Sequence, residues 1–226
     1  MRTKKIILTG LGAVCFIVTL LCIAEILVTT VCSRIFFDAY GLALIGGIMC
    51  VSASAGMLFF EKVIANEKRN KALRKIVFYT VFVTYLVMVV TAVLGTAVFM
   101  RYSSTRTLSE RIRTGMHTGN FVPFHTIMGY IRSYAAGNVF LNTVVINLVG
   151  NLVFFMPMGI FLPVITRRRW YIACPVMLVF LFLIESLQLV TGRGSFDIDD
   201  IILNFAGFLI VYLITNIKAV KKLIKI

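Results

Sequence analysis

Long hydrophobic stretches alternate with short polar segments along the whole chain. Each stretch is close to the roughly 20 residues that a helix needs to cross a hydrocarbon core of about 30 Å. The pattern therefore predicts an all-α protein, a polytopic transmembrane bundle of about six spans. The predicted spans cover residues 6–31, 39–60, 76–100, 143–165, 170–191 and 201–217.

The first stretch follows the basic start MRTKK and so resembles a signal peptide. It is longer than the roughly 7–15 apolar residues of a signal core, and no small-residue cleavage site follows it. We therefore interpret residues 6–31 as a retained first span.

The composition supports a membrane protein, because 60% of the residues are hydrophobic and only 14% are charged. Soluble domains carry about a quarter charged residues. The net charge of +14 could indicate a nucleic-acid partner. However, the basic residues fall in short blocks between the apolar stretches, which is the arrangement that orients membrane helices, so we expect no nucleic-acid binding.

The distribution of basic residues also predicts the topology. Sixteen of the 23 Lys and Arg residues, including all ten Lys, lie at the two ends of the chain and in residues 61–75 and 166–169. Lys and Arg accumulate on the cytoplasmic side of membrane proteins. Both termini are therefore predicted to be cytoplasmic, and residues 101–142 and 192–200 to face outward.

The 101–142 segment is long for a connection between helices and is rich in aromatic and aliphatic residues. This composition suits a partly folded segment at the membrane interface or one that dips between helices. Its arginines could attract anionic lipid, although a solvated flank is an equally good interpretation. The cysteines show no metal-ligand spacing, and we expect neither a metal nor a cofactor.

Polar residues recur in pairs inside the last three spans, where insertion of an acidic residue costs about 2.5–3.5 kcal/mol. Each pair has a helical spacing of three or four residues and so lies on one helix face. The pairs are Asn147 with Asn151, Glu185 with Gln188, and Asp200 with Asn204.

All three pairs are expected at a similar depth, in the outward half of the bilayer. There they can converge with Arg193, Asp197 and Asp199 of the connecting loop to form a polar pocket open to the outer face. The alternative is that the polar side chains only link the spans to one another through hydrogen bonds.

Four ordered motifs in these segments resemble the VanZ-like family of bacterial membrane proteins. They are NFVPF at 120–124, NLVGNLVFFMPMG at 147–159, ESLQ at 185–188 and RGSFDIDDIILNFAG at 193–207. The resemblance covers about residues 76–217. It implies a VanZ-like domain with its outer loop at 101–142, preceded by a transmembrane hairpin and basic loop (1–75) and followed by a basic cytoplasmic tail (218–226).

The family is named for a member associated with resistance to the glycopeptide teicoplanin, and no established reaction comes with it. The resemblance therefore implies a multi-pass protein of the bacterial plasma membrane. The motif residues that it carries onto this chain are Asn120, Pro123, Phe124, Asn147, Asn151, Pro157, Gly159, Glu185, Gln188, Arg193, Asp200, Asn204 and Gly207.

Two functions remain open at this stage. In the first, the pocket binds or modulates an envelope component, with Arg193 pairing an anionic group and the amides bonding sugar or peptide. Its partners would be membrane lipids and a lipid-linked envelope precursor or a lipoglycopeptide, and teicoplanin-type resistance is one outcome. The ligand-binding candidates are Asn120, Phe124, Asn147, Asn151, Glu185, Gln188, Arg193, Asp197, Asp200 and Asn204.

The second function is an intramembrane enzyme that acts on a lipid-linked substrate, with Glu185 or Asp200 as the catalytic base. No nucleophile is evident from the pattern, and Ser195 and His125 qualify only by their chemistry. Transport fits less well, because the chain shows no inverted repeat.

Overall fold

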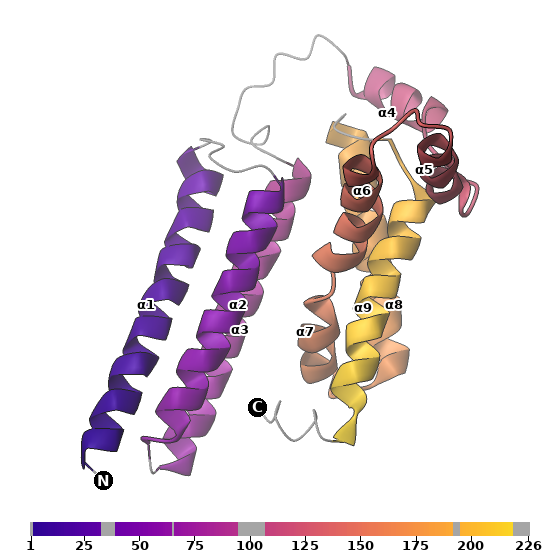
Figure 1. The fold of residues 1–226 in the computed structure, drawn as a ribbon. Coiled ribbons are helices and arrows are strands. Elements are labelled where there is room, and N and C mark those ends of the chain that lie inside the picture. Colours follow the sequence, from indigo (N-terminus) through magenta and orange to yellow (C-terminus); the bar gives the residue numbers. More distant parts are fainter. Residues whose placement is uncertain (1, 33–38, 65, 95–106, 192–194, 219–226) are drawn as a thin grey trace. The chain divides into compact units, whose positions relative to one another are not determined.

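The computed structural model describes residues 2–32, 39–64, 66–94, 107–191 and 195–218, and every regular element in these ranges is a helix (Figure 1). The expected all-α fold is confirmed. The chain divides into two compact units, Met1–Ser103 and Ser104–Lys225.

The first unit contains the helices α1 (Arg2–Cys32), α2 (Ala39–Glu61) and α3 (Glu67–Leu94), which run side by side (Figure 1). Small residues bring α1 and α2 together: a Cβ atom on Gly56 would lie 3.2 Å from Cys15 Cβ. A hydrogen bond of 2.8 Å joins the hydroxyls of Thr19 and Ser52 across the same contact. Such small-residue packing and hydroxyl bonding is typical of helix pairs in membranes.

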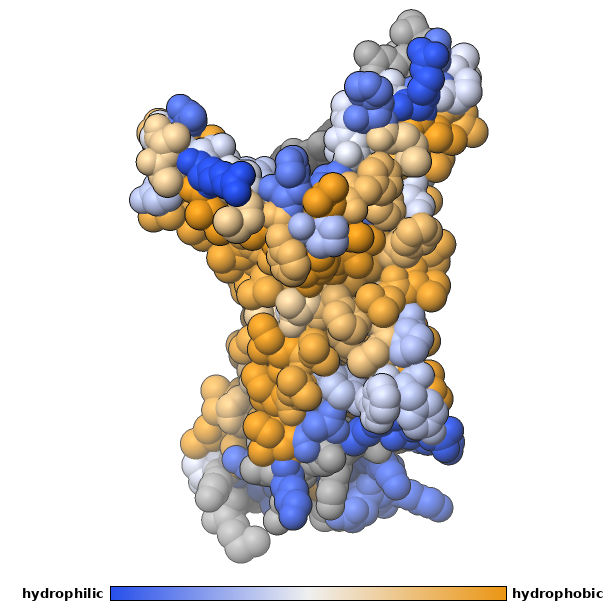
Figure 2. Space-filling model, turned by 90° about the vertical axis from the view of Figure 1, so that its right-hand side faces the viewer, coloured by the Kyte–Doolittle hydropathy of each residue, from blue (hydrophilic) through white to orange (hydrophobic). Residues whose placement is uncertain are grey.

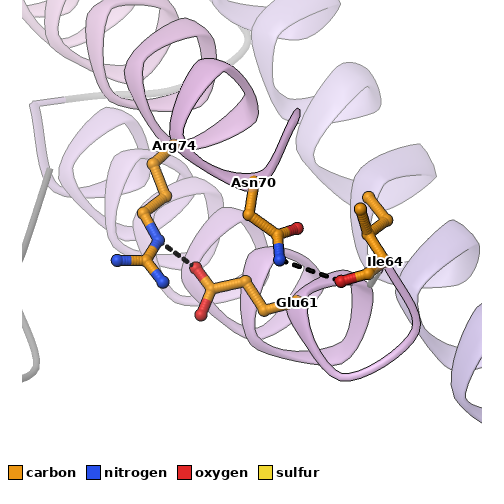
Figure 3. Close-up of polar contacts among 4 residues, drawn as sticks. All are labelled: Glu61, Ile64, Asn70 and Arg74. Atoms are coloured by element: carbon orange, nitrogen blue, oxygen red, sulfur yellow. Dashed lines mark hydrogen bonds and ion pairs between the residues drawn. The ribbon is translucent and has the colours of Figure 1, made fainter. Parts of the chain in front are cut away.

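Two polar contacts close the turn between α2 and α3 (Figure 3). The Asn70 amide donates to the Ile64 carbonyl at 3.0 Å, and Arg74 Nε pairs with Glu61 Oε1 at 2.5 Å. The helix α3 begins at Glu67, nine residues before the predicted span at 76. Lys and Arg are good helix formers whose long side chains extend into water, so the helix continues beyond its apolar part.

The second unit contains α6 (Leu141–Phe154), α7 (Met158–Ile165), α8 (Trp170–Thr191) and α9 (Ile198–Asn216). Two shorter helices, α4 (Leu108–His117) and α5 (His125–Ala135), lie at one end of this group (Figure 1). The segment 101–142 was expected to be partly folded, and in its described part, 107–142, it forms these two helices.

The predicted fourth span is interrupted between α6 and α7. The break falls at Phe155–Pro157, and Pro157 precedes α7. Proline has no amide hydrogen to continue the ladder of hydrogen bonds, which explains the break. The two halves pack against α9 through glycines. A Cβ atom on Gly159 would lie 2.6 Å from the Phe208 carbonyl oxygen, and one on Gly207 would overlap the Leu152 carbonyl.

Six helical stretches in the described residues are long and apolar enough to cross a membrane, which indicates a multi-pass membrane protein. They correspond to the six predicted spans, with α6 and α7 together forming the fourth. On the face that Figure 2 shows, hydrophobic residues cover the middle and hydrophilic residues gather toward the two ends. This distribution matches a hydrocarbon core between two polar interfaces.

Candidate functional site

The connection from α4 to α5 lies against the start of α9. The Asn120 amide nitrogen donates to the Phe196 carbonyl at 2.8 Å, and Ile198 donates back to the Asn120 carbonyl at 3.0 Å. The Phe121 and Phe196 rings stack beside this pair, with centroids 5.3 Å apart. Two segments that are 77 residues apart in the sequence are therefore held together by main-chain bonds and aromatic packing.

The Asn120 side chain extends this contact. Its Nδ2 donates to Asp197 Oδ1 at 2.9 Å and to the Thr126 hydroxyl at 3.0 Å, while its Oδ1 accepts from the Val122 amide at 3.0 Å. The Thr126 hydroxyl donates to Asp197 Oδ2 at 2.7 Å. Both oxygens of Asp197 are thus occupied by donors from the α4–α5 region.

Asp199 is fully buried and holds the N-terminus of α5. Its Oδ1 accepts from the Phe124 amide at 2.5 Å and its Oδ2 from the Ile127 amide at 3.0 Å. These amides have no partner within their own helix, and the helix dipole favours a negative charge at this end. Phe124 itself has a left-handed backbone with φ of 65°, an uncommon conformation for a residue other than glycine.

Asp197 also caps α9, because its Oδ1 accepts from the Asp199 amide at 2.8 Å. On the opposite side of the loop, the Asp197 amide donates to Glu185 Oε2 of α8 at 3.3 Å. Only 2% of Glu185 is exposed, and this is the one hydrogen bond that the described residues supply to its carboxyl group. Glu185 is also near enough to Asp200 to interact with it electrostatically.

One turn into α9, Asp200 Oδ1 accepts from the Asn151 amide of α6 at 2.5 Å. Asn204 lies one further turn along the same face and is 4% exposed. Its Oδ1 is buried and has no hydrogen-bond partner among the described residues. We call this group the acid–amide cluster, and its members are Asn120, Thr126, Asn151, Glu185, Asp197, Asp199, Asp200 and Asn204.

The cluster brings together most of the candidates predicted from the sequence. Three other candidates are placed differently. Asn147 donates to the Thr143 carbonyl of its own helix at 2.7 Å, and the Phe124 side chain is exposed while only its backbone joins the cluster. No side-chain hydrogen bond of Gln188 occurs among the described residues. Arg193, expected to pair an anionic group, lies outside the described residues.

Two cluster members, Asp199 and Thr126, are absent from the predicted ligand-binding residues, although Asp199 was expected to converge on the pocket from the connecting loop. Asp199 appears in the sequence as an acidic residue of the loop, but its role as the cap of α5 depends on a helix 72 residues away. Thr126 carries one local signal, a hydroxyl side chain in the first turn of a helix, where such residues often bond nearby groups. Its bond to Asp197 is not local, and for that reason the pattern does not reveal it.

The hydrogen bonds divide the cluster into two parts. Asp197 and Asp199 are saturated by donors from the protein and hold α5 against α9. Asn204 keeps a buried oxygen without a partner among the described residues, which is costly unless a donor is supplied, and Glu185 and Asp200 each receive a single hydrogen bond from these residues. The second part is the portion of the cluster that can bind a further group.

The described residues contain no group of three or more His, Cys, Asp or Glu side chains arranged to hold a metal ion. The side chain of His125 is exposed, and within the described ranges neither His125 nor Ser195 is hydrogen-bonded to Glu185 or Asp200. The cluster therefore combines carboxylate and amide oxygens that accept hydrogen bonds with a few amide and hydroxyl donors, and these ranges show no paired nucleophile and base.

A family model described as VanZ/LLP1 matches residues 76–219. The match contains every member of the acid–amide cluster. No curated protein and no solved structure matches the chain.

Proposed function

The chain belongs to the VanZ/LLP1 family, and on that premise we propose that it is a bacterial cell-envelope protein whose acid–amide cluster binds a hydrogen-bond-donating group of an envelope component. The observation that carries the proposal is the unsatisfied part of the cluster. Asn204 Oδ1 is buried without a partner, and Glu185, equally buried, receives a single hydrogen bond of 3.3 Å.

The chemistry of these groups selects the ligand class. Carboxylate and amide oxygens accept hydrogen bonds, so hydroxyl and ammonium groups are their natural partners. No Lys or Arg side chain is hydrogen-bonded to the cluster within the described ranges. The head group of a lipid-linked envelope precursor and the sugars of a lipoglycopeptide both carry such donors. Binding of a lipoglycopeptide would contribute to resistance against teicoplanin-type antibiotics.

The same proposal includes an orientation. The cluster faces outward and both termini lie in the cytoplasm of the bacterial cell, because 16 of the 23 basic residues fall on the side of the termini. Asn138, in the α5–α6 connection, and Arg169, in the α7–α8 connection, are both exposed and should lie on opposite sides.

Cysteine labelling in intact cells tests this orientation. In a background without the five native cysteines, an impermeant maleimide should label Asn138→Cys and leave Arg169→Cys unlabelled. Both variants should be labelled after permeabilisation, which controls for reactivity. Labelling of Arg169→Cys alone would invert the topology and contradict an outward-facing cluster.

Ligand binding is tested with the full chain in nanodiscs, using teicoplanin and a lipid-linked peptidoglycan precursor as the two probes. We expect Glu185→Gln to weaken binding of whichever probe binds the wild-type chain by about tenfold or more. The reason is that hydrogen bonds to charged groups contribute about 1.5–3 kcal/mol. The matched control is Ser186→Ala on the same helix, because among the described residues the Ser186 hydroxyl bonds only to the Phe182 carbonyl of α8. Its affinity should equal that of the wild type.

Two results would contradict the binding proposal. In the first, neither probe binds the wild-type chain. In the second, Glu185→Gln binds normally but accumulates poorly in the membrane, which is the behaviour of a residue that only holds helices together.

A second function is favoured by one observation: the buried Glu185 carboxyl group accepts a hydrogen bond from the Asp197 amide, and Asp200 lies three residues further along the same segment. Neighbouring acids in such sites can divide acid and base roles between them. In an intramembrane enzyme acting on a lipid-linked substrate, Asp200→Asn would abolish turnover while the substrate still binds. In a binding protein no turnover occurs in either form.

A further inference from the structure

The helices α4 and α5 are too short to cross a membrane. They contain 10 and 11 residues, and at about 1.5 Å per residue each covers only about half of a hydrocarbon core. Both nevertheless expose large hydrophobic side chains. An exposed apolar face on a helix that does not span the membrane marks a surface that is covered by lipid or by another molecule.

On α4 the exposed apolar residues are Leu108, Ile112 and Met116, each between 36% and 55% exposed. Their spacing of four residues places them in one stripe along the helix. The side of α4 next to this stripe is turned inward, with Gly115 buried and Arg111 half-buried, whereas Glu110 and Thr114 on the opposite side are exposed. The helix is therefore amphipathic, with its polar and apolar sides clearly separated.

On α5 a second stripe consists of Met128, Ile131 and Ala135, all of them exposed. The residues that turn inward are those next to the acid–amide cluster, where Thr126 and Ile127 bond to Asp197 and Asp199. The bonds that fix α5 on α9 therefore also fix which side of α5 is left uncovered.

Each stripe is accompanied by an exposed arginine. At 100° per residue, Arg113 lies about 60° from Met116 around α4, and Arg132 lies about 40° from Met128 around α5. No acidic side chain pairs with either arginine in the part of the chain that the structure describes. A basic flank beside an apolar stripe is the arrangement that binds the boundary between lipid head groups and acyl chains.

The position of the two helices in the chain selects the lipid surface as the occupant. Only residues 136–140 separate α5 from α6, and the 118–124 segment is bonded to the start of α9. Both α6 and α9 lie within membrane-span candidates, so α4 and α5 are held at the level where those spans enter the bilayer. Lipid phosphates are present at this level and complement the two arginines.

We propose that α4 and α5 form a docking surface for anionic lipid, with their apolar stripes in the acyl–headgroup boundary and Arg113 and Arg132 on lipid phosphates. This surface is separate from the acid–amide cluster, and it does not depend on the function proposed for that cluster. A soluble protein partner is the competing occupant, and the experiment below distinguishes the two.

The test uses the full chain in vesicles, with single cysteines carrying an environment-sensitive fluorophore in a background without native cysteines. The probe positions are Ile112→Cys in the stripe and Thr114→Cys as the matched control, because Thr114 is exposed on the other side of α4. We expect acrylamide to quench position 112 at least about threefold less than position 114, and doxyl-labelled lipid to quench position 112 preferentially. Equal quenching of both positions by acrylamide would overturn the proposal and leave the stripe free for a protein partner.

The charge component is tested by the vesicle composition. Phosphatidylglycerol at 30% in phosphatidylcholine should shift the fluorescence at position 112 further toward the blue than phosphatidylcholine alone. Arg113→Gln combined with Arg132→Gln should remove that difference while the protein still inserts and remains monodisperse. A shift that persists in the double variant, or that is absent in the parent, would overturn the assignment to anionic lipid.

Discussion

Replacing Gly207 with alanine is expected to destabilise the folded Ser104–Lys225 unit by about 3 kcal/mol, at the upper end of what overpacking costs. A Cβ atom at this position would overlap the backbone carbonyl of Leu152 in α6. A flexible side chain could rotate away from such a contact, but a backbone carbonyl cannot do so without moving its helix. The α6–α9 contact, which carries Asn151 and Asp200, should therefore loosen.

The measurement is the unfolding midpoint of the purified chain in detergent micelles, recorded by circular dichroism. The matched control is Gly47→Ala in α2, because a Cβ atom on Gly47 would meet nothing within 4 Å. That variant should match or slightly exceed the wild type, since alanine is the better helix former. If both substitutions lower the midpoint equally, close packing at Gly207 is not the reason.

Replacing Asp199 with alanine is expected to release α5 from α9, with a local loss of about 2–4 kcal/mol. The substitution leaves the amides of Phe124 and Ile127 without acceptors, and each unsatisfied buried group costs about 1–3 kcal/mol. It also removes a negative charge from the N-terminus of a helix. Hydrogen exchange in α5 should accelerate by roughly 30-fold or more, while exchange in α7 and α8 stays close to that of the wild type.

The neighbouring substitution Asp200→Asn is the control, because Asp200 bonds to Asn151 and not to α5. It should leave the exchange rates of α5 unchanged. Asp199→Asn, which keeps one acceptor oxygen and loses the charge, should give an intermediate rate. Slow exchange in α5 of Asp199→Ala would show that other contacts hold this helix in place.

The spans could be predicted from the sequence because hydropathy and length are local properties. The observed helices differ from the predicted spans mainly at polar ends such as residues 67–75. There the helix continues although the hydrophobic pattern stops. The start of α4 also has a local signal, because Thr107 and Glu110 form a reciprocal cap from the T-x-x-E spacing. That signal was present in the sequence and is absent from our predictions.

The polar pairs show that spacing along one helix does not predict which side chain contacts another helix. Helical spacing correctly places Asn147 and Asn151 near one another on α6, yet only Asn151 reaches Asp200 while Asn147 bonds to its own helix. The two residues share one face of α6 but lie one turn, about 6 Å, apart along its axis, and only Asn151 is level with Asp200. Which turn of α6 lies level with Asp200 depends on how α6 and α9 pack, and spacing within one helix carries no information about it.

The sequence by itself determined the all-helical, membrane-spanning character of this protein and the family to which it belongs. Hydrophobic length, basic-residue blocks and short motifs are sufficient for those conclusions, because each is read within one segment. Only the tertiary structure decided that Asp197 and Asp199 hold α5 while Asn204 retains a buried oxygen without a partner among the described residues. The physical reason is that hydrogen-bond saturation depends on donors from segments as many as 77 residues away.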